Sequence, residues 1–146
     1  MSLIYTHPSG GKLFQVGIRE IPNLVKEHDI SLIIYAAKEH QPYTSNPSII
    51  KMFIPLDDTV NLSPQQIIDT LKLACEASTT AANYLKAGKN VISSCAAGLN
   101  RSGLVSAFTL NKCTNANKKD IVTHIRRARH QHALSNMLFV KLFLTS

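Results

Sequence analysis

A capped helix between two short apolar runs is the feature of this sequence that most constrains its fold. Ser63 can cap the helix, because Pro64 takes the first helical position and Gln66 lies three residues after Ser63. Apolar or small residues then recur at steps of three and four, which predicts one buried stripe: Ile68, Leu71, Cys75, Ser78, Ala82 and Leu85. Because a helix between two buried strands is the crossover unit of a parallel sheet, this segment predicts an α/β fold.

Short apolar runs extend the same pattern along the chain. The predicted strands are residues 12–17, 30–35, 49–55 and 89–94. The uninterrupted run ISLIIY of the second strand is typical of a strand buried on both faces. A short helix is expected over 21–28 and a surface loop over 39–47. We therefore expect a mixed, mainly parallel central sheet flanked by helices.

The C-terminal part is predicted to be helical. After Gly98 the apolar spacing becomes helical again, Asn117 can cap a further helix, and Ser135 can cap a last one. A chain of 146 residues is about one domain long and can bury a core without a disulfide or a metal. A single domain over residues 1–146 is the resulting prediction.

Composition and charge limit the class of protein. Hydrophobic residues make up 45% of the chain and charged residues 17%, as in ordinary globular proteins. No apolar run approaches the roughly 18 residues that span a bilayer, and the N-terminus does not resemble a secretory signal. We therefore expect a cytoplasmic or nuclear protein that is not secreted, does not bind membranes and keeps its three cysteines as free thiols. The net charge of +7 favours anionic partners, such as phosphorylated protein or nucleic acid, but equally suits plain solubility.

The candidate chemistry lies where the last predicted strand gives way to a helix. Cys95 and Arg101 are six residues apart across this junction, with Gly98 between them and Ser102 directly after. Ligands bind at the carboxyl edge of parallel sheets, and a loop of small residues before a helix can aim its N–H groups at an anion. Arg101 can add a bidentate fork for two phosphate oxygens. Such a positive environment favours a Cys95 thiolate facing a bound phosphate.

The stretch from Cys95 to Gly103 resembles the signature loop of the cysteine-dependent protein phosphatases, H-C-x-x-G-x-x-R-[ST]. The compact dual-specificity branch fits the chain length best. Later residues are similar to small bacterial and viral proteins of this type: Ile125, Arg126, Ala133, Leu134, Asn136 and Phe139. The resemblance implies a phosphatase that uses no metal or other cofactor. It would hydrolyse phosphate monoesters, above all phosphoprotein, through a phosphocysteine intermediate.

The resemblance also assigns roles to individual residues. It implies that Cys95 is the nucleophile, that Arg101 clamps the phosphate and that Ser102 assists the sulfur. The implied backbone cradle consists of Ala96, Ala97, Gly98, Leu99 and Asn100.

A general acid is implied as well, in the form of an Asp between the third strand and the long helix. Asp57 and Asp58 both lie there. We assign the role to Asp58 and keep Asp57 as the alternative. The chemistry requires a neutral carboxyl close to the leaving oxygen.

Two positions leave other functions open. Ser94 stands where the family usually has a His before the nucleophile. This departure predicts a less reactive Cys95 and leaves a non-catalytic phospho-binding protein as an alternative. Asn100 before Arg101 matches the related enzymes that act on triphosphate-ended RNA, so an RNA 5′-triphosphatase is a second alternative.

The remaining polar residues suggest less specific roles. Arg126, Arg127 and Arg129 could form a second anion site, but a solvated basic helix face is the favoured interpretation. The histidines of this region, which are His124, His130 and His132, lack the pairing of a metal site. Cys113 could be a core residue or a resolving thiol for an oxidised Cys95.

Overall fold

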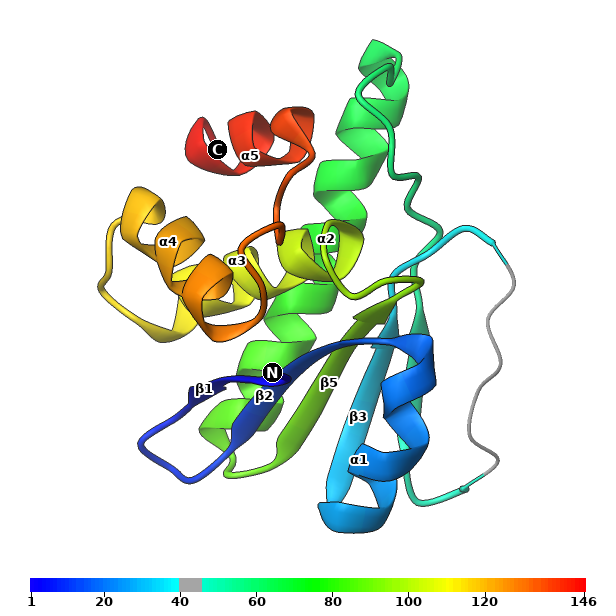
Figure 1. Ribbon diagram of the computed structural model, residues 1–146, viewed down its shortest axis with the longest axis vertical. Coiled ribbons are helices and arrows are strands. Elements are labelled where there is room, and N and C mark those ends of the chain that lie inside the picture. Colours follow the sequence, from blue (N-terminus) through cyan, green and yellow to red (C-terminus); the bar gives the residue numbers. More distant parts are fainter. Residues whose placement is uncertain (40–45) are drawn as a thin grey trace.

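The computed structural model describes residues 1–39 and 46–146 of the chain (Figure 1). The loop predicted over 39–47 therefore falls largely outside the described residues. The strands are β1 (Leu3–Thr6), β2 (Lys12–Gly17), β3 (Ile30–Tyr35), β4 (Ile50–Phe53) and β5 (Asn90–Cys95). The helices are α1 (Ile21–Glu27), α2 (Pro64–Lys86), α3 (Arg101–Cys113), α4 (Lys118–Ala128) and α5 (Met137–Leu144), and the short 3-10 turn η1 (Ile18–Glu20) precedes α1.

The strands form one sheet in the order β1-β2-β5-β3-β4. Neighbouring strands are parallel except at the edge, where β1 runs antiparallel to β2. The predicted mixed, mainly parallel sheet is thus confirmed. Strand β1 itself was not predicted, because four residues are too few to give a clear periodic pattern. Because β5 is the central strand, its carboxyl end lies between the carboxyl ends of β2 and β3.

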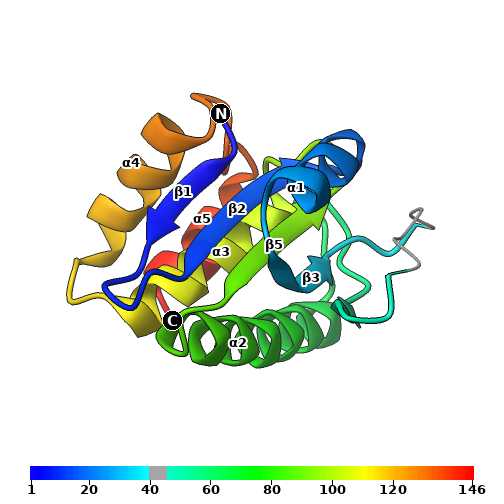
Figure 2. The ribbon, with the colours of Figure 1, turned by 90° about the horizontal axis from the view of Figure 1, so that it is seen from below.

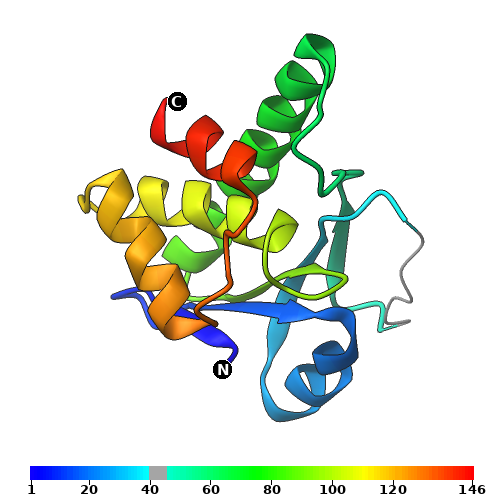
Figure 3. The same cartoon turned by 45° about the horizontal axis from the view of Figure 1, so that its top comes forward.

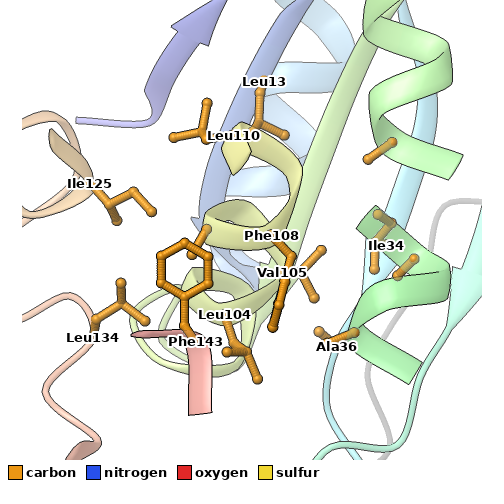
Figure 4. Close-up of a cluster of buried hydrophobic side chains, with 14 of the residues drawn as sticks. Leu13, Ile34, Ala36, Leu104, Val105, Phe108, Leu110, Ile125, Leu134 and Phe143 are labelled. Carbon is orange, nitrogen blue, oxygen red and sulfur yellow. The ribbon is translucent and has the colours of Figure 1, made fainter. Parts of the chain in front are cut away.

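Helices cover both faces of this sheet (Figure 2). On one face, Ile21 and Leu24 of α1 pack in a small cluster with side chains from β2, β3 and β5. On the other face a larger core joins α2, α3, α4 and α5 to the sheet. Helix α3 lies at the centre of this core, where Leu104 and Phe108 are flanked by the sheet and by the C-terminal helices (Figure 4). Because α3 is packed on several sides, its first turn is rigidly placed at the sheet edge.

Helix α2 begins at the predicted capping box. Ser63 Oγ accepts a hydrogen bond from the Gln66 N–H at 3.2 Å, and Gln66 Oε1 accepts one from the Ser63 N–H at 2.8 Å. The predicted buried stripe is wrong at its start, since Ile68 is 58% exposed. The helix instead buries Thr70, Ala74, Ala77, Ser78, Ala81, Ala82 and Leu85. Among the described helices, none combines the length and the apolar character needed to cross a membrane.

The C-terminal helices begin at two asparagine caps. Asn117 caps α4, as predicted, by accepting a hydrogen bond from the Asp120 N–H at 2.8 Å. The prediction for α5 is wrong by one residue: Asn136, not Ser135, caps this helix by accepting from the Phe139 N–H at 3.1 Å. Serine and asparagine are equally good caps, so the sequence alone could not separate these neighbours.

Candidate active site

The stretch from Cys95 to Gly103 lies at the carboxyl edge of the sheet. Cys95 is the last residue of the central strand β5, and Arg101 is the first residue of α3. The five residues between them form the turn that joins the two elements, which we call the cradle loop (residues 96–100). In Figure 3 this loop is the yellow-green segment between β5 and α3, and the orange segment between α4 and α5 passes beside it. Cys95 is buried, with 2% of its surface exposed.

Carbonyl groups of the cradle loop accept hydrogen bonds from other parts of the chain. Arg129 donates to the carbonyls of Ala97 and Gly98 at 3.2 and 3.0 Å. Gln15, fully buried in β2, donates to the carbonyls of Gly98 and Leu99 at 3.0 and 3.4 Å. The Leu99 carbonyl also accepts a hydrogen bond from the N–H of residue 134. Three consecutive carbonyls of the loop are therefore fixed.

The N–H groups of the same loop have no acceptor in the part of the chain that the structure describes. In a planar trans peptide, the N–H of one residue points opposite to the carbonyl of the residue before it. The fixed carbonyls of Ala97, Gly98 and Leu99 therefore turn the N–H groups of Gly98, Leu99 and Asn100 to the opposite side. A run of such N–H groups, continued by the first turn of α3, is a typical site for an anion.

Gly98 makes this loop conformation possible. Its φ is +74°, which side chains of L-residues rarely allow. A Cβ on Gly98 would lie 2.3 Å from the backbone carbon of Val16 and 2.4 Å from the backbone nitrogen of Gly17. The loop therefore packs directly on β2, and any side chain at position 98 would displace it.

Arg101 is oriented by an ion pair that the sequence did not predict. The residue is only 6% exposed, and its two terminal nitrogens donate to the two carboxylate oxygens of Glu39. Nη1 also donates to the carbonyl of Leu56 at 3.3 Å. The buried Nε has no partner within the described residues. Glu39 thus occupies the two terminal nitrogens that the sequence predicted would bind two phosphate oxygens, and Nε is left as a donor without a partner among the described residues.

The charge of Arg101 is secured by its neighbours. Burial alone would lower the pKa of this guanidinium, but the hydrogen bond with Glu39 and the nearby Cys95 and Asp58 outweigh that effect and raise the pKa. In turn, the hydrogen bond from Arg101 lowers the pKa of the Glu39 carboxyl. Both groups are therefore charged at neutral pH, and Arg101 is a permanent cation beside the thiol.

The hydroxyls around Cys95 have separate partners. Cys95 Sγ and Ser102 Oγ are hydrogen bonded at 3.2 Å. Ser93 donates to the carbonyl of Ser102 at 2.9 Å and so ties β5 to the first turn of α3. Ser94, directly before Cys95, is fully buried and donates to the carbonyl of Ile34 at 2.8 Å. Its hydroxyl therefore fixes β5 to β3.

The two acid candidates lie in different surroundings. Asp58 accepts hydrogen bonds from the side chains of Asn100, at 3.1 Å, and Asn136, at 2.8 Å, and this places it beside the cradle loop. Asp57 instead forms an ion pair with Lys38 at 2.9 Å. Both partners of that pair line a separate groove of about 490 Å³ along α2. Of the two carboxyls, that of Asp58 is hydrogen bonded to the cradle loop, through the side chain of Asn100.

Other sequence interpretations change with the structure. The prediction of a solvated basic helix face is wrong for Arg126 and Arg129. Arg126 donates to the carbonyls of residues 133 and 134. Arg129 donates to the cradle loop and forms an ion pair with Glu20. Cys113 ends α3, about 18 Å from the helix start at 1.5 Å per residue, which is too far to pair with Cys95. Among the described residues, no group of three or more side chains suits a metal ion.

Four supporting residues were missed by sequence reasoning in these roles. They are Gln15, Glu39, Arg129 and Asn136. The nearest of them lies more than 25 positions from the cradle loop in sequence, so no local spacing links them to Cys95. One signal was available, since a polar residue such as Gln15 inside a buried apolar strand needs a hydrogen-bond partner.

Comparison with known proteins supports the same fold. No family model and no curated protein matches the sequence. Among solved structures, human DUSP28 is 18% identical, with 99% of this chain and 92% of that chain covered and a TM-score of 0.74. DUSP15 is 19% identical, covering 98% and 85% with a TM-score of 0.70, and Tk-PTP in its active form is 17% identical, covering 97% and 92% with a TM-score of 0.67. The chain therefore has the compact fold of the dual specificity phosphatases.

Proposed function

We propose that this protein is a cysteine-dependent phosphatase that hydrolyses phosphate monoesters, above all phosphorylated protein. The observation that carries this proposal is the combination of Cys95, the unpaired N–H groups of the cradle loop and the unpaired Nε of Arg101 at one sheet edge. These groups supply a nucleophile and several donors for the oxygens of one phosphate group. The net charge of +7 suits a phosphorylated, anionic substrate. We expect the protein to act in the cytoplasm or nucleus.

The first chemical step transfers the phosphoryl group to sulfur. The Cys95 thiolate attacks the phosphorus in line, so that an S–P bond forms while the P–O bond to the leaving group breaks. The loop N–H groups and Arg101 stabilise the charge on the equatorial oxygens. Asp58 gives its proton to the leaving oxygen, which departs as an alcohol or a phenol.

The second step returns the enzyme to its starting state. The Asp58 carboxylate takes a proton from a water molecule, whose oxygen attacks the phosphorus and breaks the S–P bond. Inorganic phosphate leaves, and the thiolate is regenerated. The Ser102 hydroxyl, 3.2 Å from the sulfur, stabilises that thiolate as it departs.

The purified chain is expected to hydrolyse an aryl phosphate such as p-nitrophenyl phosphate in the presence of excess EDTA. Vanadate, which mimics the five-coordinate phosphorus, is expected to inhibit it competitively. Phosphate release measured with and without EDTA and vanadate checks both points. Activity that disappears with EDTA and returns with a divalent metal would contradict the proposed mechanism, as would insensitivity to vanadate.

Substrate choice separates the proposal from its alternatives. Asn100, which motivated the RNA alternative, is hydrogen bonded to Asp58, so its presence is explained without RNA. In the same phosphate-release assay we expect phosphopeptides to be better substrates than triphosphate-ended RNA. Faster release from the RNA would favour the triphosphatase. Phosphopeptide binding without any turnover between pH 5 and pH 9 would favour a non-catalytic phospho-binding protein.

A further inference from the structure

Asn136 reaches from the start of α5 to the segment that carries Asp58. The residue is 6% exposed, and its side-chain nitrogen donates to Asp58 Oδ1 at 2.8 Å and to the Thr59 carbonyl at 3.1 Å. Its side-chain oxygen is already used as the cap of α5. Both ends of this amide are thus occupied, and its orientation is fixed.

Asn100 of the cradle loop completes a closed ring. Its side-chain oxygen accepts a hydrogen bond from the Asn136 backbone N–H at 2.9 Å, and its nitrogen donates to Asp58 Oδ2 at 3.1 Å. The two oxygens of the Asp58 carboxyl are therefore held by two different amides. The ring joins three segments that are far apart in sequence: the Asp58 loop, the cradle loop and the start of α5.

The backbone that presents Asn136 is itself unusual. Leu134 has a φ of +56°, the one non-glycine residue with positive φ among those described, and such a conformation is costly for a branched side chain. Its N–H donates to the Leu99 carbonyl at 3.1 Å, and its carbonyl accepts from Arg126 Nη2 at 2.8 Å. Contacts on both sides therefore maintain a strained turn just before Asn136. Strain of this kind is often kept where a residue must be held in one place.

We propose that Asn136 is a positioning residue that fixes the carboxyl of Asp58 relative to the cradle loop, so that its proton reaches the leaving oxygen. This inference rests on the proposed function. Asn136 acts through Asp58 and touches no reacting atom, so its contribution is confined to the step in which a proton is delivered. That contribution should grow as the leaving group becomes more basic, because a poor leaving group depends more on protonation.

The test uses Asn136→Ser, since serine can cap α5 as well as asparagine but lacks the amide donor to Asp58. The substrates are phenyl phosphate, with a poor leaving group, and p-nitrophenyl phosphate, with a good one. We expect kcat/KM to fall about tenfold for phenyl phosphate and less than about twofold for p-nitrophenyl phosphate, since a small misplacement of a catalytic group is costly. Asn117→Ser, which makes the same change at the cap of α4, is the matched control and should leave both values unchanged.

Asp58→Asn provides the reference for interpreting the result. Its loss of kcat/KM should be larger than that of Asn136→Ser and should show the same dependence on the leaving group. If Asp58→Asn shows this dependence and Asn136→Ser reduces both substrates equally or neither, the positioning role is wrong and the proposed function stands. If Asp58→Asn itself shows no dependence on the leaving group, the acid assignment fails and the inference fails with it. Melting temperatures of Asn136→Ser and Asn117→Ser show whether the two cap changes have comparable effects on folding.

Discussion

Cys95→Ser is expected to lower kcat for p-nitrophenyl phosphate by on the order of 10⁴-fold or more, as the loss of a covalent nucleophile does in other enzymes. A serine hydroxyl is nearly the same size as a thiol but is far less ionised at neutral pH, so the S–P bond of the first step has no counterpart. Binding of a phosphopeptide should persist, because the loop N–H groups and Arg101 remain in place. Initial rates and calorimetric titration with the phosphopeptide measure the two effects separately.

The chain contains its own control for this substitution. Cys113 is also a free thiol but lies at the far end of α3, so Cys113→Ser should keep full activity. A Cys95→Ser variant with unchanged turnover would rule out sulfur as the nucleophile. Loss of phosphopeptide binding in a well-folded Cys95→Ser variant would show that the loop alone does not hold the phosphate.

Arg101→Lys is expected to lower kcat/KM by roughly 10³-fold, even though the positive charge is kept. A lysine can still pair with Glu39, but it has no equivalent of the Nε donor that Arg101 leaves unpaired. The Nε–H donor that would bind a phosphate oxygen in the transition state is lost, whereas ground-state attraction between opposite charges remains. Most of the loss should therefore appear in kcat, which steady-state kinetics with an aryl phosphate resolves.

Arg127→Lys serves as the comparison for Arg101→Lys. Arg127 is exposed on α4 outside the cradle loop, so the same chemical change there should leave kcat and KM as they are. Equal behaviour of the two variants would mean that Arg101 contributes only its charge. A rise in KM without a change in kcat would assign Arg101 to substrate binding alone.

Local patterns were sufficient to predict the main elements of the fold. The capping box at Ser63, the buried run ISLIIY and the cap at Asn117 all lie where the structure has them. Their signals depend on residues within one or two helical turns, or within one strand. The spacing of Cys95 and Arg101 is local in the same way, because one turn between a strand and a helix determines it.

The contacts that orient the site are not local. Glu39 meets Arg101 across 62 positions, and Asn136 meets Asp58 across 78. Such pairs are decided by how the sheet and helices pack, and neither partner carries a pattern that identifies the other. For the same reason, the sequence could not decide which of Asp57 and Asp58 is the general acid. The two residues are adjacent and differ only in their tertiary partners. Asp57 pairs with Lys38, whereas Asp58 is hydrogen bonded to two asparagines.

Trapping of the phosphoenzyme tests the central claim most directly. Asp58→Asn should still form the S–P bond with p-nitrophenyl phosphate, whose leaving group needs little protonation, but should hydrolyse it slowly. Rapid acid quench followed by mass spectrometry is predicted to find one phosphoryl group per chain, located on the peptide that contains Cys95. Substrate turnover by this variant without any phosphorylated Cys95, or with the phosphoryl group on another residue, would contradict a mechanism through phosphocysteine.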